Sequence, residues 1–254
     1  MTLEWYEHVN ITEWYLDIVN PSSPGKLLLV GEVLGLRPGM RVIDFASGFG
    51  QPLALWAERF GISGVGVEIR EHACDKARRR LAERNVSDRV EIVCADASTY
   101  AFEPGAYDVA CCIGATFIWG GFQPAIQRLR AAAKPGGRLV VGEPYWRHGP
   151  PPKEHAEEQG ISNTEADLLR LAHEERYDIE YVVRSSIDDW DRYEAGNWRG
   201  AIRWARENPS HPEVAAIAES MRRRQTQYMA YDRENFGWAI YVLNPVVFTS
   251  QGRA

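Results

Sequence analysis

Short apolar runs alternate with longer amphipathic stretches from Met40 onward, and this alternation predicts a parallel β-sheet covered by helices on both faces. Pro52 fits the first turn of a helix after the first strand, and Pro135-Gly136-Gly137 is expected to end a helix over 124–134. The short connections indicate right-handed crossovers. The first half of the chain supplies five strand candidates: 41–45, 64–68, 90–94, 107–112 and 138–142.

The second half of the chain has a different pattern. Residues 177–184 and 237–247 read as a sixth and a seventh strand, and the segment 187–235 between them has helical periodicity. A simple crossover needs far fewer residues, so this segment predicts an inserted helical cap. Helix starts with capping boxes are expected at Ser162-Asn163-Thr164-Glu165 and at Ser210-His211-Pro212-Glu213.

These patterns predict an α/β fold with a doubly wound, seven-stranded and mostly parallel sheet. Residues 1–37 carry aromatic side chains before Asn20-Pro21 and are expected to form an N-terminal helical lid. Residues 38–254 are then the main domain, with the cap inserted in it.

Composition narrows the function classes. The net charge is −6, and the basic triplets Arg78–Arg80 and Arg222–Arg224 read as solvated helix faces, so nucleic acid is not expected as a partner. The start of the chain lacks a signal-peptide pattern and no apolar run is long enough to span a membrane, which predicts a cytoplasmic protein. No cysteine or histidine spacing indicates a disulfide frame or a metal site, so no metal is expected.

The strongest chemical signal is the loop Asp44-Phe45-Ala46-Ser47-Gly48-Phe49-Gly50, which follows the first strand and precedes a helix. Small residues let the backbone approach a ligand, and a helix N-terminus favours a polar or anionic group. Glu68 closes the second strand, where a carboxylate can accept hydrogen bonds from ribose hydroxyls. Asp96, beside Ala97 after the third strand, can accept one from an adenine amine. All three acids fall at carboxyl ends of parallel strands, which predicts one ligand crevice.

The order of these motifs, with Cys112-Ile113-Gly114-Ala115-Thr116 after the fourth strand and Lys134-Pro135-Gly136-Gly137 before the fifth, resembles the class I S-adenosylmethionine-dependent methyltransferases. Over residues 114–119 and 142–146 the chain is also similar to a group of poorly characterised bacterial small-molecule methyltransferases. The resemblance implies that S-adenosyl-L-methionine is the cofactor, with S-adenosyl-L-homocysteine as product. It assigns the ribose to Glu68, the adenine to Asp96 and Ala97, the space under the sulfonium to Ile113 and Gly114, and the methionine moiety to Asp44, Ala46, Ser47, Gly48 and Gly50.

One residue departs from the family pattern. Ala46 stands where the family has the first loop glycine, which is tolerable if its φ is negative. A positive φ at Ala46 would weaken the assignment.

Methyl transfer from a sulfonium depends mainly on alignment, so few catalytic side chains are expected. Glu143, Tyr145 and His148 are the candidates for accepting a proton from a hydroxyl or amine acceptor. Tyr15, Trp119, Tyr145 and Trp146 are the candidates for the walls of the pocket that binds the small-molecule substrate. The sequence leaves the acceptor, its reacting atom and the oligomeric state open.

Two other functions remain possible on these residues. An NAD(P)-dependent reductase shares the fold, but no tyrosine here is followed by lysine four positions later. A non-catalytic S-adenosylmethionine-binding sensor or scaffold would keep the cofactor contacts without an acceptor pocket. Methylation of amino groups on nucleic acid bases is disfavoured, because the fourth strand lacks the Asn/Asp-Pro-Pro-aromatic signature.

Overall fold

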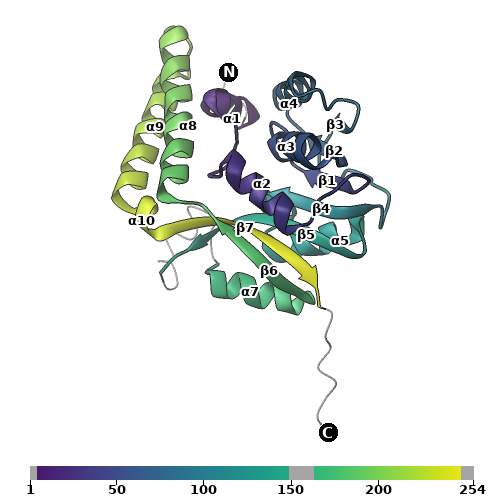
Figure 1. The fold of residues 1–254 in the computed structure, drawn as a ribbon. Helices are drawn as coiled ribbons and strands as arrows, with labels where there is room; N and C mark the ends of the chain where they lie inside the picture. The colour runs from purple at the N-terminus through teal and green to yellow at the C-terminus, as the bar shows by residue number, and fades with distance from the viewer. Residues whose placement is uncertain (1–4, 149–162, 247–254) are drawn as a thin grey trace.

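A seven-stranded sheet forms the centre of the computed structural model, which describes residues 5–148 and 163–246 (Figure 1). The strand order is β3-β2-β1-β4-β5-β7-β6, and β7 runs antiparallel to both β5 and β6. The predicted mostly parallel α/β sheet is therefore confirmed. The strands are β1 Arg41–Phe45, β2 Ser63–Glu68, β3 Val90–Cys94, β4 Tyr107–Ile113, β5 Ala133–Trp146, β6 Tyr177–Arg184 and β7 Phe236–Pro245.

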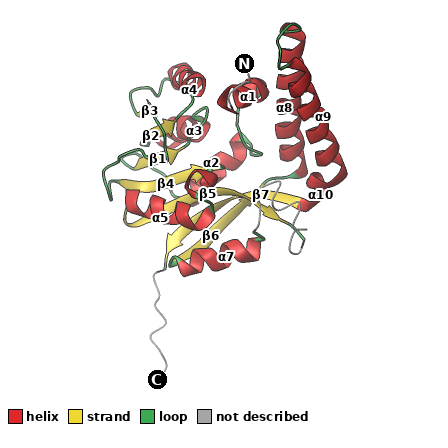
Figure 2. Ribbon diagram, turned by 180° about the vertical axis from the view of Figure 1, so that it is seen from behind, coloured by secondary structure: helices red, strands yellow, loops and turns green. Residues whose placement is uncertain are grey.

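Helices cover the two faces of the sheet (Figure 2). One core cluster packs α2 Pro24–Val33, α3 Gln51–Phe60 and α4 Glu71–Glu83 against the strands. A second cluster packs α5 Phe122–Ala132 and α7 Glu165–Glu174 on the opposite face. Short 3-10 turns occur at η1 Glu13–Tyr15 and η2 Thr116–Trp119.

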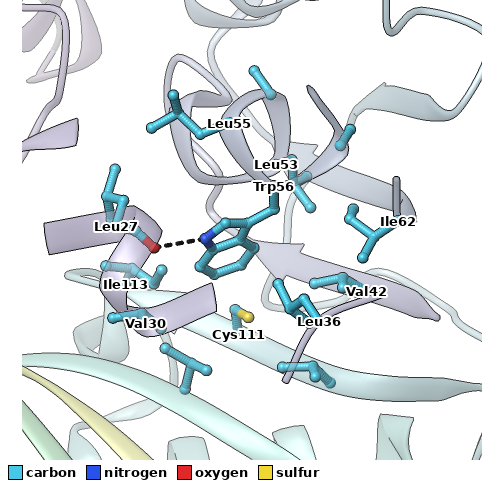
Figure 3. Packing of buried hydrophobic residues seen from close by; sticks show 14 of the residues in the cluster. Leu27, Val30, Leu36, Val42, Leu53, Leu55, Trp56, Ile62, Cys111 and Ile113 are labelled. Atoms are coloured by element: carbon cyan, nitrogen blue, oxygen red, sulfur yellow. Dashed lines mark hydrogen bonds between the residues drawn. The ribbon is translucent and has the colours of Figure 1, made fainter. Parts of the chain in front are cut away.

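Trp56 of α3 is the largest fully buried side chain of the first core cluster (Figure 3). Its indole Nε1 donates a 2.7 Å hydrogen bond to the backbone oxygen of Leu27 in α2. A buried indole N–H needs such a partner, so this bond fixes the position of α2 beside α3.

A second group of helices lies beyond the sheet edge. It consists of α1 Trp5–Thr12, α8 Ile187–Glu207, α9 Val214–Gln227, the π-helical turn η3 Tyr228–Asp232 and α10 Arg233–Asn235. In both ribbon views α1 lies between the α8–α9 pair and the α3–α4 side of the sheet (Figures 1 and 2). Gly200 of α8 allows a close approach, because a Cβ there would come within 2.3 Å of the Thr12 backbone oxygen.

Three predicted boundaries differ in the structure. The helix predicted over 124–134 ends at Ala132, and the segment 134–137 belongs to the long strand β5, whose Ala133 pairs with Tyr107. The helix expected to start at Ser162 has its capping box at Thr164 and Asp167, and Ser162 itself lies outside the described residues. The box predicted at Ser210 is wrong, because α9 begins after Glu213 without a side-chain cap.

No helix in the described part of the chain combines the length and the apolar character that crossing a membrane requires.

Candidate functional site

The loop after β1 turns sharply under the first turn of α3. Ser47 donates its backbone N–H to the Val67 oxygen on β2, and Gly50 donates to the Ser47 oxygen. Gly48 and Gly50 have φ of 54° and 67°, which only glycine adopts without strain. The turn therefore brings bare backbone to the sheet edge, as the sequence predicted.

Ala46 has a φ of 55°, which is the case that weakens the assignment of the methionine moiety to this residue. The left-handed conformation costs an L-residue about 1–2 kcal/mol. The negative φ that the cofactor assignment requires at Ala46 is therefore absent. The backbone at Ala46 nevertheless has the left-handed conformation that a glycine would adopt there. The cost of this conformation lowers the free energy of unfolding of the protein.

Glu68, at the end of β2, is buried and holds this loop. Its Oε2 accepts a 2.8 Å hydrogen bond from the Gly48 backbone N–H, and its Oε1 accepts bonds from the backbone and the Nε of Arg70 at 3.0 and 3.1 Å. A carboxylate offers about four lone-pair sites, so roughly one site remains for a ligand hydroxyl.

Arg70 joins Glu68 to the N-terminal segment. Its Nη1 donates a 2.7 Å bond to Glu13 of η1, and all three side chains are largely buried. Burial raises the pKa of Glu13, and the ion pair with Arg70 opposes that rise. The segment that carries α1 is thereby tied to the acid at the end of β2.

Asp96, after β3, is exposed, and its Oδ1 accepts a 2.8 Å bond from the Ser98 backbone N–H. The structure describes no bond to its Oδ2. Ala97 beside it is buried, whereas the apolar side chain of Ile69 is 41% exposed at the sheet edge. This corner of the site offers one acceptor and apolar surfaces, a combination that suits a flat ring with an amino group.

Asp44, at the end of β1, borders a hollow of about 20 Å³ below the loop. Its Oδ1 and the buried Asn20 Oδ1, Ser47 Oγ and Gln51 Oε1 have no hydrogen-bond partner within the described residues. Burial raises the pKa of Asp44 to about 7, and the charge of Glu68 adds to the rise. Such a cluster of unpaired acceptors suits a ligand that brings several donors.

A cavity of about 510 Å³ opens beside this loop, a size within the range of small-molecule sites. The half of the cavity at the carboxyl ends of the strands, here called the sheet-edge half, is lined by Glu13, Val19, Ala46, Gly48, Glu68, Ile69, Arg70, Asp96, Ala97, Ile113, Gly114, Ala115, Phe117 and Ile118. Its helical half is lined from α1, α8 and α9 by Trp5, Tyr6, His8, Val9, Thr12, Tyr193, Asn197, Trp198, Ala201, Ile217, Ser220, Met221 and Arg224.

The structure brings together most residues of the predicted cofactor set. Ala46, Gly48, Glu68, Asp96, Ala97, Ile113 and Gly114 line the sheet-edge half. Asp44 and Ser47 line the adjoining hollow, which shares Val19, Ala46 and Ile113 with the cavity. Gly50 lines neither, and a Cβ on it would lie 3.1 Å from Ala77 in α4, so it serves the loop–helix packing.

The four side chains predicted as substrate walls do not line the cavity. Tyr145 and Trp146 are buried in the sheet, where the Trp146 ring meets Phe236 edge-on at 4.4 Å. Trp119 packs edge-on against Phe45 at 5.4 Å, and Tyr15 lies under the guanidinium of Arg199. For Tyr145 and Trp146 the reason lies in β5, which continues to Trp146 because β7 pairs with it over its whole carboxyl half.

The predicted catalytic side chains also lie outside the cavity lining. Besides Tyr145, Glu143 is buried on β5 and accepts a 2.6 Å bond from the Thr116 hydroxyl. Burial raises its pKa to about 7 against the effect of that bond. His148 is exposed beyond the end of β5.

Several lining residues escaped the sequence interpretation. They include His8 of α1, Asn197 and Trp198 of α8 and Arg224 of α9, and α1 is distant in sequence from the other two helices. Ile69 could have been found from the sequence, since it directly follows Glu68 at the end of the second strand. Within the described residues, no group of three or more His, Cys, Asp and Glu side chains could hold a metal ion.

Comparison with known proteins gives consistent results. Residues 42–137 match a family model described as a methyltransferase domain. The YjhP protein of Escherichia coli K12 is 38% identical over 232 residues, which cover 89% of this chain and 93% of that protein.

Two solved structures are also similar over nearly their whole length. A methyltransferase from Geobacter sulfurreducens has a TM-score of 0.89 and 35% identity, over 94% of this chain and 98% of the other. One from Thiobacillus denitrificans has a TM-score of 0.88 and 32% identity, over 96% and 100%. Both are described as S-adenosylmethionine-dependent and were solved with S-adenosyl-L-homocysteine.

Proposed function

This chain belongs to the class I S-adenosylmethionine-dependent methyltransferases, and on that premise we propose that its cavity binds S-adenosylmethionine in the sheet-edge half and a small-molecule methyl acceptor in the helical half. The observation that carries the proposal is the division of one continuous cavity. Strand-end acids line one half, and aromatic and apolar helix residues line the other. Two ligands that must meet in line need such adjoining subsites.

The ammonium group at the methionine end of the cofactor fits the small hollow beside Asp44. It brings three N–H donors to a place where Asp44 Oδ1, Asn20 Oδ1 and Gln51 Oε1 lack partners within the described residues. A bound ammonium favours the ionised form of Asp44, whose pKa burial raises to about 7. Gly48, with its positive φ, leaves backbone room beside the methionine chain.

The adenosine end fits the acids of the next two strands. Glu68 keeps about one lone-pair site for a ribose hydroxyl, and further bonds to the ribose require Arg70 to give way. Asp96 Oδ2 can accept from the adenine amine, while Ile69 and Ala97 offer apolar contact to the ring.

S-adenosylmethionine supplies an activated methyl group, which the acceptor's nucleophilic atom takes as the S–C electron pair returns to sulfur. The protein's part is to align the two ligands and keep water out, which can supply about 7–11 kcal/mol. A proton released by the acceptor can pass to His8 in the helical half. Burial, and secondly the charge of Arg224, lower the pKa of His8, which favours the neutral imidazole that can accept a proton.

The proposal assigns no substrate contact to Glu143, Tyr145 or His148, because none of them lines the cavity. The aromatic lining of the helical half, from Trp5, Tyr6 and Trp198, favours an enzyme over a non-catalytic cofactor sensor. Transfer of label from methyl-labelled S-adenosylmethionine to a compound in a metabolite extract separates these two functions.

The binding test is the variant Glu68→Gln, which keeps the side-chain shape and removes the charge. It should weaken S-adenosyl-L-homocysteine binding by about 1–3 kcal/mol, because charge-assisted hydrogen bonds are lost. Isothermal calorimetry measures the affinity. The matched control is Glu91→Gln, an exposed position on β3 outside the cavity. Equal affinities of both variants and the unmodified protein would contradict the ribose assignment.

A further inference from the structure

Arg224 is the one permanently charged side chain among the described residues that line the helical half. Its carboxylate partner is Glu194 of α8, which accepts from Arg224 Nε at 2.8 Å and from Nη2 at 2.7 Å. The Glu194 side chain is 4% exposed, whereas that of Arg224 is 53% exposed. Glu194 thus anchors the guanidinium from the buried side and leaves its other side open.

The remaining donors of Arg224 have a defined geometry. A guanidinium carries five N–H groups in one plane, and Glu194 occupies the Nε–H and one Nη2–H. Both Nη1 hydrogens and the second Nη2 hydrogen have no partner within the described residues. The edge formed by Nη1 and Nη2 matches the two oxygens of a carboxylate.

A second donor lies on the same wall. Trp198 follows Glu194 by one helical turn on α8, and its Nε1–H is buried without a partner in the described part of the chain. The Trp198 ring meets Tyr228 at 5.8 Å, and Tyr228 lies one turn after Arg224. A buried indole N–H without a partner is costly, which indicates that a ligand or a water molecule satisfies it.

We infer that the helical half binds a methyl acceptor with an aromatic or apolar body and a carboxylate group, and that Arg224 holds this carboxylate through its free Nη1–Nη2 edge. This inference rests on the proposed function and adds the chemical class of the acceptor. Trp5, Tyr6 and Met221 supply the apolar contacts for the body. A cationic acceptor is disfavoured, because Arg224 would repel it in a partly desolvated site.

The test uses the full chain saturated with S-adenosyl-L-homocysteine and three probes of similar shape: benzoate, benzamide and benzylamine. Ligand-observed NMR titration measures their dissociation constants. Benzoate should bind at least tenfold more tightly than benzamide, and benzylamine least tightly. Phenyl phosphate is a fourth probe, and tighter binding of it than of benzoate would overturn the carboxylate assignment.

The variants locate the effect. Arg224→Gln should remove the preference for benzoate, while Arg222→Gln, an exposed position on α9 outside the cavity, should keep it. Because Arg224→Gln leaves Glu194 buried without a partner, the double variant Glu194→Gln/Arg224→Gln removes both charges and protects the fold.

Each outcome is decisive. Equal binding of benzoate and benzamide, absence of benzoate binding in the millimolar range, or an unchanged preference in the Arg224 variants overturns the inference. Calorimetry with S-adenosyl-L-homocysteine, done first, separates the two proposals. Failure of that binding refutes the proposed function, whereas normal binding without selection for benzoate refutes the acceptor class alone.

Discussion

The contact between α1 and α8 predicts a specific sensitivity to a single methyl group. A Cβ added at Gly200 would lie 2.3 Å from the Thr12 oxygen and 2.4 Å from the Ile11 oxygen. Both are backbone atoms that cannot rotate away, so α1 must move by about 1 Å to restore ordinary contact. Overpacking of this kind costs about 1–3 kcal/mol, and replacing glycine by alanine inside a helix returns up to about 1 kcal/mol. Gly200→Ala should therefore lower the free energy of unfolding by up to about 2 kcal/mol.

The control isolates the clash. A Cβ at Gly25, in the first turn of α2, would meet nothing within 4 Å, so Gly25→Ala should be neutral or stabilising. Thermal unfolding should differ between the two variants by about 2–4 °C for each kcal/mol of clash. Hydrogen exchange should show faster exchange in α1 of Gly200→Ala. The reasoning is refuted if the two variants share a melting temperature and α1 exchanges as in the unmodified chain.

Two further predictions concern the loop after β1. Because burial raises the pKa of Asp44 to about 7 from 3.8, the folded chain holds a proton that the unfolded chain loses. The stabilisation from Asp44 is full below about pH 4 and is lost as the pH rises through about 7. The free energy of unfolding of Asp44→Asn, relative to that of the unmodified protein, should thus rise by about 2–3 kcal/mol between pH 5 and 8 in urea unfolding, and a constant difference would contradict this. Ala46→Gly should raise stability by up to about 1 kcal/mol, since it relieves the strain of a positive φ at some cost in unfolded-state entropy. Ala97→Gly, at a position without positive φ, should lower it.

The sheet-edge half of the cavity could be predicted from the sequence because its chemistry is local. Asp44, Glu68 and Asp96 each lie within two residues of the carboxyl end of a strand, and parallel strands bring these ends to one edge of the sheet. The register confirms this, since Asp44 is opposite Gly66 and Glu68 is opposite Cys94. Recognising the strands was sufficient to bring these acids together.

The helical half could not be predicted in the same way. His8, Trp198 and Arg224 meet because α1, α8 and α9 pack together, and helical periodicity shows which face is apolar without showing which helix covers it. Trp198 fits the apolar stripe of α8 equally well as a core residue. The sequence signal that could have indicated the contact is the pair Gly196 and Gly200, one turn apart, where a Cβ would meet Leu16 and the Thr12 oxygen.

The errors at Tyr145, Trp146 and Glu143 have one physical cause. The sequence suggested that β5 ends near Gly142, which would have placed these side chains in a loop above the sheet edge. In the structure the antiparallel strand β7 pairs with β5 as far as Trp146 and Phe236, so β5 remains a strand for four more residues. The Tyr145 and Trp146 rings are then buried in the sheet layers and are unavailable to a ligand. The length of a strand depends on its partner, and here the partner lies about ninety residues later in the chain.

The two halves of the cavity are consequently positioned by different forces. Hydrogen-bonded register fixes the strand-end acids, and a change there alters the sheet itself. Side-chain packing fixes α1 against α8, with the Glu13–Arg70–Glu68 network joining α1's segment to the sheet. Packing tolerates substitution better than register does. Variation in acceptor chemistry on this fold should therefore concentrate on α1, α8 and α9. Gly200→Ala tests whether the two halves are positioned separately, because it should disturb benzoate binding more than S-adenosyl-L-homocysteine binding.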